Sequence, residues 1–343
     1  MTDLAQRFAR FLEANINDAS DVVVEHMDRI HGGASRETYR CKVRWHEGGR
    51  EVERGLILRR DPPSSLIETK REIEYGAYRA FQDTDVPVPA ALFLETDSQW
   101  LERPFFVMEE VAGSPANPFQ PEPYGQHAER IGEQFWTILG QIAAADWRTN
   151  GLVDVLEAPK PEDCWRRELG YWEGVIDQDE LEPQPIARAA IRWLRRNPPP
   201  PAQRIVVVHG DYRSGNFLFD NTGDVRAILD WEMCHLGDPL EDLAWAFDPL
   251  WAAGDTQRPA QLVDRAAAVD LWKRSSGLQV DPVAFEWWQI FAHVKGLAIW
   301  ISSSKEYATG ANSDPLFLVS GWLCTDRHNR ILVEKLAAKA EEQ

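Results

Sequence analysis

The chain has 343 residues, with 55 acidic against 37 basic side chains and a formal net charge of −18. Such a charge repels phosphate backbones and anionic lipid headgroups, which argues against nucleic acids and membrane surfaces as partners. Hydrophobic residues make up 44% of the chain, enough to bury a core in one large or two moderate domains, so global disorder is excluded.

Cysteine spacing and hydropathy bear on the cellular location and on the possible metal or redox sites. The four cysteines lie far apart and form no C-x-x-C pair, which argues against a zinc knuckle or a redox dithiol and fits reduced thiols. The N-terminal residues lack the apolar core of a signal peptide, and we find no apolar run of about 18 residues that would span a bilayer. We therefore expect a cytoplasmic protein. Nothing in the sequence indicates its oligomeric state.

The first third of the chain predicts a small antiparallel sheet. Phe8, Phe11 and Leu12 have the spacing of an amphipathic helix. Strand-like segments follow, separated by turn-prone loops rich in glycine. In chain order, the expected elements are a helix over residues 1–16, strands over 22–30, 38–45 and 55–60, a helix over 68–81 and a buried strand within 104–113.

Beyond a Pro-rich stretch at residues 115–123 the character of the chain changes. Helices are expected over 126–149, 162–178 and 185–196, short strands within 205–230, and a Trp-rich helical region from Pro239 onward. The pattern predicts an α+β protein of two lobes. The boundary is expected near residue 111, with a β-rich nucleotide-binding lobe over 1–111 and a larger, mainly helical catalytic and substrate-binding lobe over 112–343.

The segment 205–232 carries the strongest chemical signal. An apolar strand leads into the polar loop HGDYRSGN at residues 209–216, and a later strand ends at Asp230. Two strands would thereby present Asp211, Asn216 and Asp230 close together. Carboxylate and amide oxygens are ligands that suit Mg²⁺ together with phosphates and water.

This segment resembles the aminoglycoside and choline kinase-like phosphotransferases and, more distantly, the protein kinases. Their loop reads H-x-D-x-x-x-x-N, which residues 209–216 match at each defined position, and their metal-binding Asp corresponds to Asp230. The resemblance implies a protein-kinase-like fold and ATP and Mg²⁺ as cofactors. It makes Asp211 the base and Asn216 and Asp230 the metal ligands. Arg213 is expected to neutralise the transferred phosphate.

The same resemblance assigns cofactor-binding residues to the first lobe. Gly33 and Ser35 belong to a loop expected over the phosphates, although its glycines depart from G-x-G-x-x-G. Arg59 occupies the place of the phosphate-pairing lysine of protein kinases, with Arg60 interpreted as a solvated surface residue. Its acidic partner is Glu74 or Glu72, and the distance to the segment VPVP (86–89) favours Glu74.

The segment FFVMEEVAG (105–113) resembles the hinge that binds adenine through the backbone, here at Glu109 and Val111. Downstream, Asp238 and Asp242 are expected to cap or anchor the helix that begins near Pro239. His209 is interpreted as a structural residue of the loop.

The leading hypothesis is transfer of the ATP γ-phosphate to a hydroxyl of a small molecule, either an aminoglycoside-like compound or a hydroxylated metabolite or hydroxyacyl compound. Two alternatives stay open. One is a non-catalytic nucleotide-binding module of the pseudokinase type. The other is a metal-dependent hydrolase that would use His209, Asp211, Asp230 and His235. The sequence carries no short motif that identifies the acceptor or separates ATP from GTP.

Overall fold

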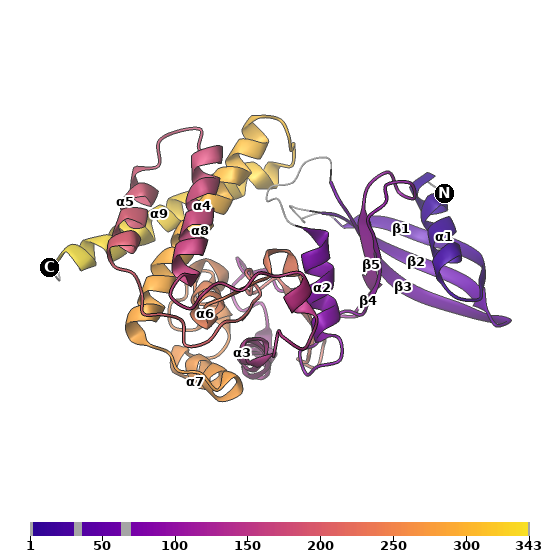
Figure 1. The fold of residues 1–343 in the computed structure, drawn as a ribbon, viewed down its shortest axis with the longest axis horizontal. Coiled ribbons are helices and arrows are strands. Elements are labelled where there is room, and N and C mark those ends of the chain that lie inside the picture. Colours follow the sequence, from indigo (N-terminus) through magenta and orange to yellow (C-terminus); the bar gives the residue numbers. More distant parts are fainter. Residues whose placement is uncertain (1–2, 31–35, 63–69, 342–343) are drawn as a thin grey trace.

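The computed structural model describes residues 3–30, 36–62 and 70–341. Its first lobe is a five-stranded antiparallel sheet in the order β1-β2-β3-β5-β4 with one helix against each face (Figure 1). The strands are β1 (Ala19–Ile30), β2 (Glu37–Glu47), β3 (Arg50–Arg60), β4 (Ala91–Glu95) and β5 (Phe105–Glu109), and the helices are α1 (Asp3–Asn15) and α2 (Arg71–Phe81).

Alternation along β3 explains why both faces of the sheet are covered. Leu56 and Leu58 are buried in the cluster that includes Phe8 and Phe11 of α1, whereas Ile57 belongs to the core that includes Tyr78 of α2. Successive side chains of a strand point to opposite faces, so one apolar strand contributes to both cores. The sheet therefore connects the N-terminal helix to the rest of the protein.

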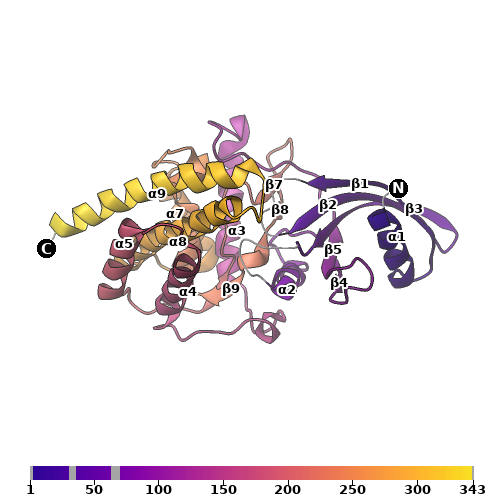
Figure 2. The ribbon, with the colours of Figure 1, turned by 90° about the horizontal axis from the view of Figure 1, so that it is seen from above.

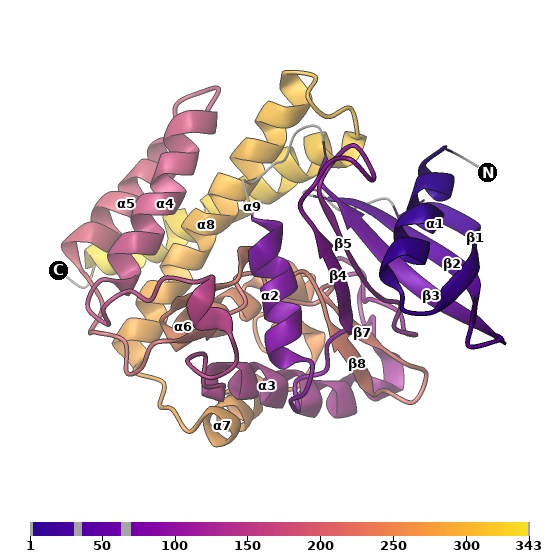
Figure 3. The same cartoon turned by 45° about the vertical axis from the view of Figure 1, so that its right-hand side comes forward.

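The remainder of the chain is mainly helical and packs beyond α2, on the side away from α1 (Figures 1 and 3). Its helices are α3 (Ala128–Ala144), α4 (Cys164–Asp179), α5 (Pro185–Arg196), α6 (Pro239–Ala246), α7 (Arg265–Ser276), α8 (Pro282–Ala308) and α9 (Pro315–Glu341). The short strands β6 (Val206–Val208) and β9 (His235–Gly237) pair with each other, as do β7 (Phe217–Phe219) and β8 (Val225–Ile228). The α+β class is confirmed. Among the described residues, no helix has both the length and the apolarity to cross a membrane.

The long C-terminal helices bury most of the aromatic side chains expected in the core. Trp287, Trp288 and Phe291 of α8 are at most 2% exposed. Trp322 is instead 75% exposed and belongs to α9, a helix that runs along the surface of the molecule (Figure 2).

A buried charge network joins four elements of the helical lobe. The Lys295 ammonium on α8 donates to Glu241 on α6 at 3.0 Å, and His235 Nε2 on β9 lies 3.1 Å from the other oxygen of Glu241. Glu168 of α4 lies 3.6 Å from the same imidazole nitrogen. Burial alone would lower the pKa of His235, but Glu168 and Glu241 outweigh it and raise the pKa to about 9. The imidazole is therefore charged at neutral pH.

This network predicts a loss of stability at alkaline pH. Because the pKa of His235 is raised from 6.5 to about 9 on folding, its contribution is fully present below pH 6.5 and is lost as the pH rises through 9. The contribution is at most about 3 kcal/mol, at 1.36 kcal/mol for each pKa unit. We expect denaturant unfolding at pH 6, 7.5 and 9.5 to show this decline in the free energy of unfolding.

His235→Gln is expected to be less stable than the parent at pH 6 and to have a flatter pH profile. His46→Gln serves as the matched control, since the His46 side chain is 41% exposed on β2 and should leave the profile unchanged. Equal pH profiles for His235→Gln and the parent protein would contradict the assignment.

Candidate functional site

A cavity of about 430 Å³ lies between the first lobe and the loop that follows β6. Its walls come from β2 and β3, from the segment after β5 and from both polar motifs. Lining residues include Arg40, Arg59, Met108, Glu109, Val111, Arg213, Asn216 and Asp230. The sequence hypothesis names nine described residues for catalysis, cofactor binding or metal binding, when Glu72 is counted as the alternative to Glu74. Eight of them line this cavity or contact residues that line it.

 The exception is Glu72, which forms an ion pair with its neighbour Arg71 at 2.9 Å.

Asp211 is held in one orientation by three donors. Its Oδ1 accepts from the Trp245 indole at 2.8 Å and from Arg213 Nε at 3.0 Å, and its Oδ2 accepts from Asn216 Nδ2 at 2.6 Å. The carboxylate is largely enclosed, with 16% of the side chain exposed. Such an arrangement fixes where the carboxylate points before any substrate arrives.

Asn216 and Asp230 offer oxygen ligands of the kind that Mg²⁺ prefers. The amide nitrogen of Asn216 donates to Asp211, so its carbonyl oxygen is the atom left for a cation. Asp230 follows β8 in the left-handed region, at φ 67° and ψ 52°. Non-glycine residues rarely adopt this conformation, and it concentrates at functional sites. The donor set therefore fits a magnesium ion.

Arg59 links the first lobe to Asp230. Its Nη2 lies 2.8 Å from Asp230 Oδ1 and 3.2 Å from Glu74 Oε1, and the residue is 9% exposed. Burial alone would raise the pKa of Asp230, but Arg59 outweighs it and keeps that pKa below its usual value. For Glu74, which is fully buried, burial dominates over Arg59 and raises the pKa.

The interpretation of Arg60 as a solvated surface residue is wrong. Arg60 is 9% exposed. Its Nε donates to Glu37 at 2.9 Å and its Nη1 donates to the Leu101 carbonyl at 3.1 Å. Alternation placed it on the face of the sheet opposite Arg59, as expected, but the loop between β4 and β5 covers that end of the strand.

The backbone before Asp211 is anchored from the helical lobe. Both carboxylate oxygens of Asp242 accept backbone N–H groups, from His209 at 2.6 Å and from Gly210 at 2.9 Å. Lys295 donates to the Gly210 carbonyl at 2.6 Å. Gly210 has φ +86°, and a side chain there would overlap the Met233 carbonyl. Asp238 caps α6 by accepting from the Leu240 N–H, whereas Asp242 anchors the loop rather than the helix.

His209 is poorly suited to a hydrolytic metal centre. Its Nδ1 accepts from the Asp211 N–H, and its Nε2 lies 2.9 Å from the Leu229 carbonyl, to which it donates. Burial lowers the pKa of His209 to about 4, so the ring is neutral at neutral pH. Both nitrogens are therefore occupied by structural hydrogen bonds, as the structural interpretation of His209 requires, and the hydrolase hypothesis loses a ligand.

The segment after β5 presents backbone groups to the cavity. At the end of β5, the Glu109 N–H donates to the Ala90 carbonyl at 2.9 Å, so this N–H is not available to a ligand. Within the described part of the chain, the Val111 N–H donates no hydrogen bond. Arg213 lies over the Trp251 ring at 4.5 Å. Gly33 and Ser35 fall outside the described residues.

Two residues that position Asp211 were missed by sequence reasoning, Trp245 and Lys295. Trp245 lies in the segment LGDPLEDLAW (236–245), in which no local pattern indicates that the indole reaches Asp211. Lys295 interrupts the apolar stretch of α8 and is 1% exposed. A lone lysine among apolar helical residues was the available signal, since a buried ammonium needs partners.

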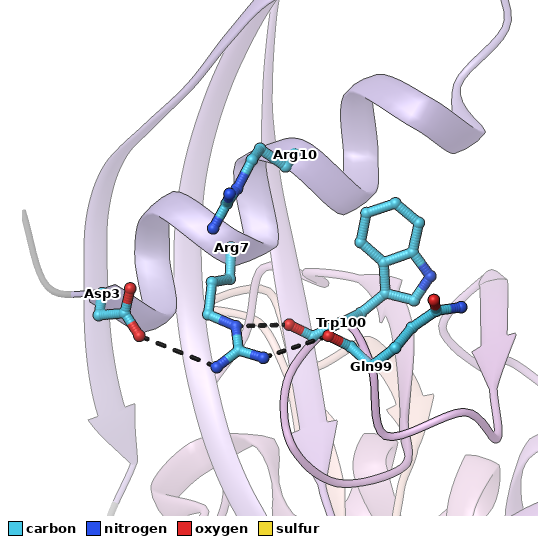
Figure 4. Close-up of a pocket in the computed structure, with 5 residues that line it drawn as sticks. All are labelled: Asp3, Arg7, Arg10, Gln99 and Trp100. Atoms are coloured by element: carbon cyan, nitrogen blue, oxygen red, sulfur yellow. Dashed lines mark hydrogen bonds and ion pairs between the residues drawn. The ribbon is translucent and has the colours of Figure 1, made fainter.

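Another cavity, of about 440 Å³, lies at α1, remote from these motifs (Figure 4). Its central cation, Arg7, donates to the carbonyls of Trp100 and Gln99 and forms an ion pair with Glu102. These contacts fasten α1 to the loop between β4 and β5. The cavity is therefore part of the packing of the sheet, and it holds none of the residues that the sequence hypothesis singles out.

Comparison with proteins of known structure supports the two-lobed kinase-like fold. A structure from Ralstonia eutropha, provisionally described as an aminoglycoside phosphotransferase, superposes with a TM-score of 0.72 at 21% identity and covers 96% of this chain and 97% of its own. A thermostable mutant of aminoglycoside phosphotransferase APH(4)-Ia, in a ternary complex with AMP-PNP and hygromycin B, superposes with a TM-score of 0.60 at 17% identity, over 96% of this chain and 98% of its own.

The sequence relatives are of two kinds, an acyl-CoA dehydrogenase family member and a phosphotransferase. Acyl-CoA dehydrogenase family member 10 of Mus musculus is 31% identical over 241 residues, which is 69% of this chain and 21% of that protein. Viomycin phosphotransferase of Streptomyces vinaceus is 28% identical over 154 residues, which is 42% of this chain and 49% of that protein. The chain thus spans only part of the relatives' length. Residues 26–278 match the phosphotransferase enzyme family, and the chain belongs to that family.

Proposed function

We propose that this protein transfers the γ-phosphate of ATP to a hydroxyl of a small molecule. One observation carries the proposal: Asn216 and Asp230 line a single cavity together with Arg59, which is paired with Glu74. Asp211 is hydrogen-bonded to Asn216 at the wall of this cavity. Residues 1–111 would form the nucleotide-binding lobe and 112–343 the catalytic and acceptor-binding lobe. The family relationship and the solved complexes with nucleotide analogues support this assignment.

In the proposed mechanism, Asp211 accepts the proton of the acceptor hydroxyl while that oxygen attacks the γ-phosphorus. The new bond joins the acceptor oxygen to phosphorus, and the bond between the γ-phosphorus and its bridging oxygen breaks, so ADP leaves. The donors from Trp245 and Asn216 keep the carboxylate oriented. Arg213, 3.0 Å from Asp211, would neutralise charge on the transferred group.

The charges of the cavity explain why a divalent cation is needed. Three arginines line it (Arg40, Arg59 and Arg213), and three carboxylates face them (Glu109, Glu110 and Asp230). These formal charges cancel, so the protein alone cannot balance a triphosphate. Asn216 and Asp230 would hold Mg²⁺, which supplies charge neutralisation to the phosphates when bound.

The remaining cofactor contacts follow from the walls of the cavity. The backbone of Glu109, the last residue of β5, and of Val111 would pair with the adenine edge, since both residues line the cavity. Arg59 would pair with the phosphates while Glu74 fixes its position. Gly33 and Ser35 are proposed for the loop over the phosphates on the family resemblance alone.

The primary test is binding of Mg·ATP by isothermal titration calorimetry, followed by ADP release across a panel of hydroxylated metabolites and aminoglycosides. We expect Mg²⁺-dependent binding and ADP release that an acceptor stimulates. Nucleotide binding with slow hydrolysis that no acceptor stimulates would favour the pseudokinase-like alternative. Absence of nucleotide binding in a folded sample would overturn the proposal.

Asp211→Asn tests the base. The amide keeps the shape of the side chain, but it offers one acceptor oxygen in place of two and cannot take the hydroxyl proton. We expect phosphate transfer to fall by on the order of 10²-fold or more, with the dissociation constant of Mg·ATP largely unchanged. Transfer assays and calorimetry on the same preparation measure both quantities, and turnover comparable to the parent would remove Asp211 from this role.

Asp230→Ala tests the metal site. Removing the carboxylate takes away a Mg²⁺ ligand and one of the anions that compensate Arg59, so we expect weaker binding of Mg·ATP. Asp220→Ala, on the exposed turn between β7 and β8, is the control of the same residue type. Titration of ATP with and without Mg²⁺ provides the measurement. An unchanged affinity for Mg·ATP in Asp230→Ala would contradict the assignment.

A further inference from the structure

A second cavity, of about 310 Å³, adjoins the site at the residues that follow Asp230. Its walls come from the start of α2, from α4, from the segment after Asp230 and from Lys295 of α8, elements that lie near one another in Figure 2. The two cavities share a wall, because Glu232 lines the second cavity and lies 3.8 Å from Arg59, which lines the first.

The second cavity also reaches the backbone next to the proposed base. Lys295 lines it, and the same ammonium donates to the carbonyl of Gly210, the residue before Asp211. A molecule bound there would lie beside the loop that carries Asp211 and beside the residues that follow Asp230. The cavity therefore adjoins the elements that a hydroxyl acceptor would need to reach if the nucleotide occupies the first cavity.

The charged groups at this cavity have a positive sum, whereas the net charge of the whole chain is negative. Four cations line it (Lys70, Arg167, His235 and Lys295), against two carboxylates, Glu168 and Glu232. Glu241 compensates Lys295 and His235 from behind. The count is four positive charges against three negative ones, in a protein whose formal net charge is −18.

Two of these cations are placed to receive a ligand. Lys70 is exposed just before α2, where its carbonyl accepts from the Ile73 N–H. Its ammonium forms no ion pair or hydrogen bond with any residue that the structure describes. Arg167 directs Nη1 and Nη2 to the carbonyls of Glu157 and Leu236 and Nε to Glu168, which fixes its guanidinium at the wall. The apolar part of the lining is supplied by Ile73, Tyr171, Trp172 and Met233.

We propose that this second cavity binds the phosphate acceptor and selects hydroxylated compounds that combine an apolar body with an anionic group, rather than polycations. The inference rests on the proposed phosphotransferase function. An anionic group would lie near Lys70 and Arg167, while the aliphatic or aromatic body contacts Trp172 and its apolar neighbours. A polycation would bring like charges against these side chains, which disfavours its binding.

The test compares probes that share a hydroxylated six-carbon chain and differ in the end group, which is negative, neutral or positive. A six-carbon ω-hydroxycarboxylate, its methyl ester and the matching amino alcohol are titrated by calorimetry with and without Mg·ADP, and each is assayed as an acceptor by ADP release. We expect the acid to bind about tenfold or more tightly than the amine, with the ester between them. Binding of the acid without nucleotide keeps this result separate from the question of ATP use.

The second part of the test is a charge-reversal variant at the cavity. Lys70→Glu is expected to weaken binding of the acid by about threefold or more, as for a partly exposed ion pair, and to leave Mg·ATP affinity unchanged. Arg274→Glu, an exposed position on α7, is the control and should change neither. A weak response of the ester to Lys70→Glu is also expected, since it carries no charge.

The outcomes separate the two proposals. Equal binding of acid and amine, a preference for the amine, or no binding of the acid would overturn the assignment of this cavity and leave the phosphotransferase function standing. Failure to bind Mg·ATP while the acid still binds with the expected charge dependence would overturn the function and leave an anion-selective cavity. Loss of Mg·ATP affinity in Lys70→Glu would contradict the separation of the two cavities.

Discussion

The buried guanidinium of Arg59 is the constraint on which the site depends. An unpaired charge in a protein interior is expensive, so a cation that is 9% exposed must be surrounded by carboxylates. Glu74 and Asp230 come to it from α2 and from the segment after β8, two elements more than 150 residues apart in the chain. Satisfying one charge therefore fixes the position of α2 against the sheet and of the segment after β8 against both.

The features that depend on residues close together in the chain could be predicted from the sequence. The spacing of Asp211 and Asn216 within one loop brought their side chains into a hydrogen bond of 2.6 Å, because a five-residue separation in a tight turn leaves little freedom. Alternation along β3 correctly separated Arg59 from Arg60. The same rule could not show that Arg60 is buried, since its partners Glu37 and Leu101 come from other segments. The antiparallel sheet and the helical lobe followed from periodicity, although several boundaries moved by a few residues.

Contacts between residues that are far apart in the chain could not be predicted from the sequence. Trp245 lies 34 residues from Asp211 and Lys295 lies 85 residues from Gly210, and no period or motif relates them. Their side chains meet the loop because α6 and α8 pack beneath it. Lys295 illustrates the limit: its burial in an apolar helix signals a partner, but which carbonyl or carboxylate receives it depends on how the helices pack. The roles of the eight described site residues rest on the family resemblance and on geometry together.

In both cavities the balance of charges on the walls differs from the strongly negative net charge of the chain. A chain with a formal net charge of −18 repels anions at long range, yet a phosphotransferase must hold a polyphosphate. The first cavity is lined by three arginines that three carboxylates balance, so the formal charges of its own walls cancel. The second cavity places one more cation than carboxylate around its walls. Because fields from exposed charges are screened within about 10 Å at ordinary ionic strength, the local balance at each wall, rather than the net charge, decides which molecules can bind there.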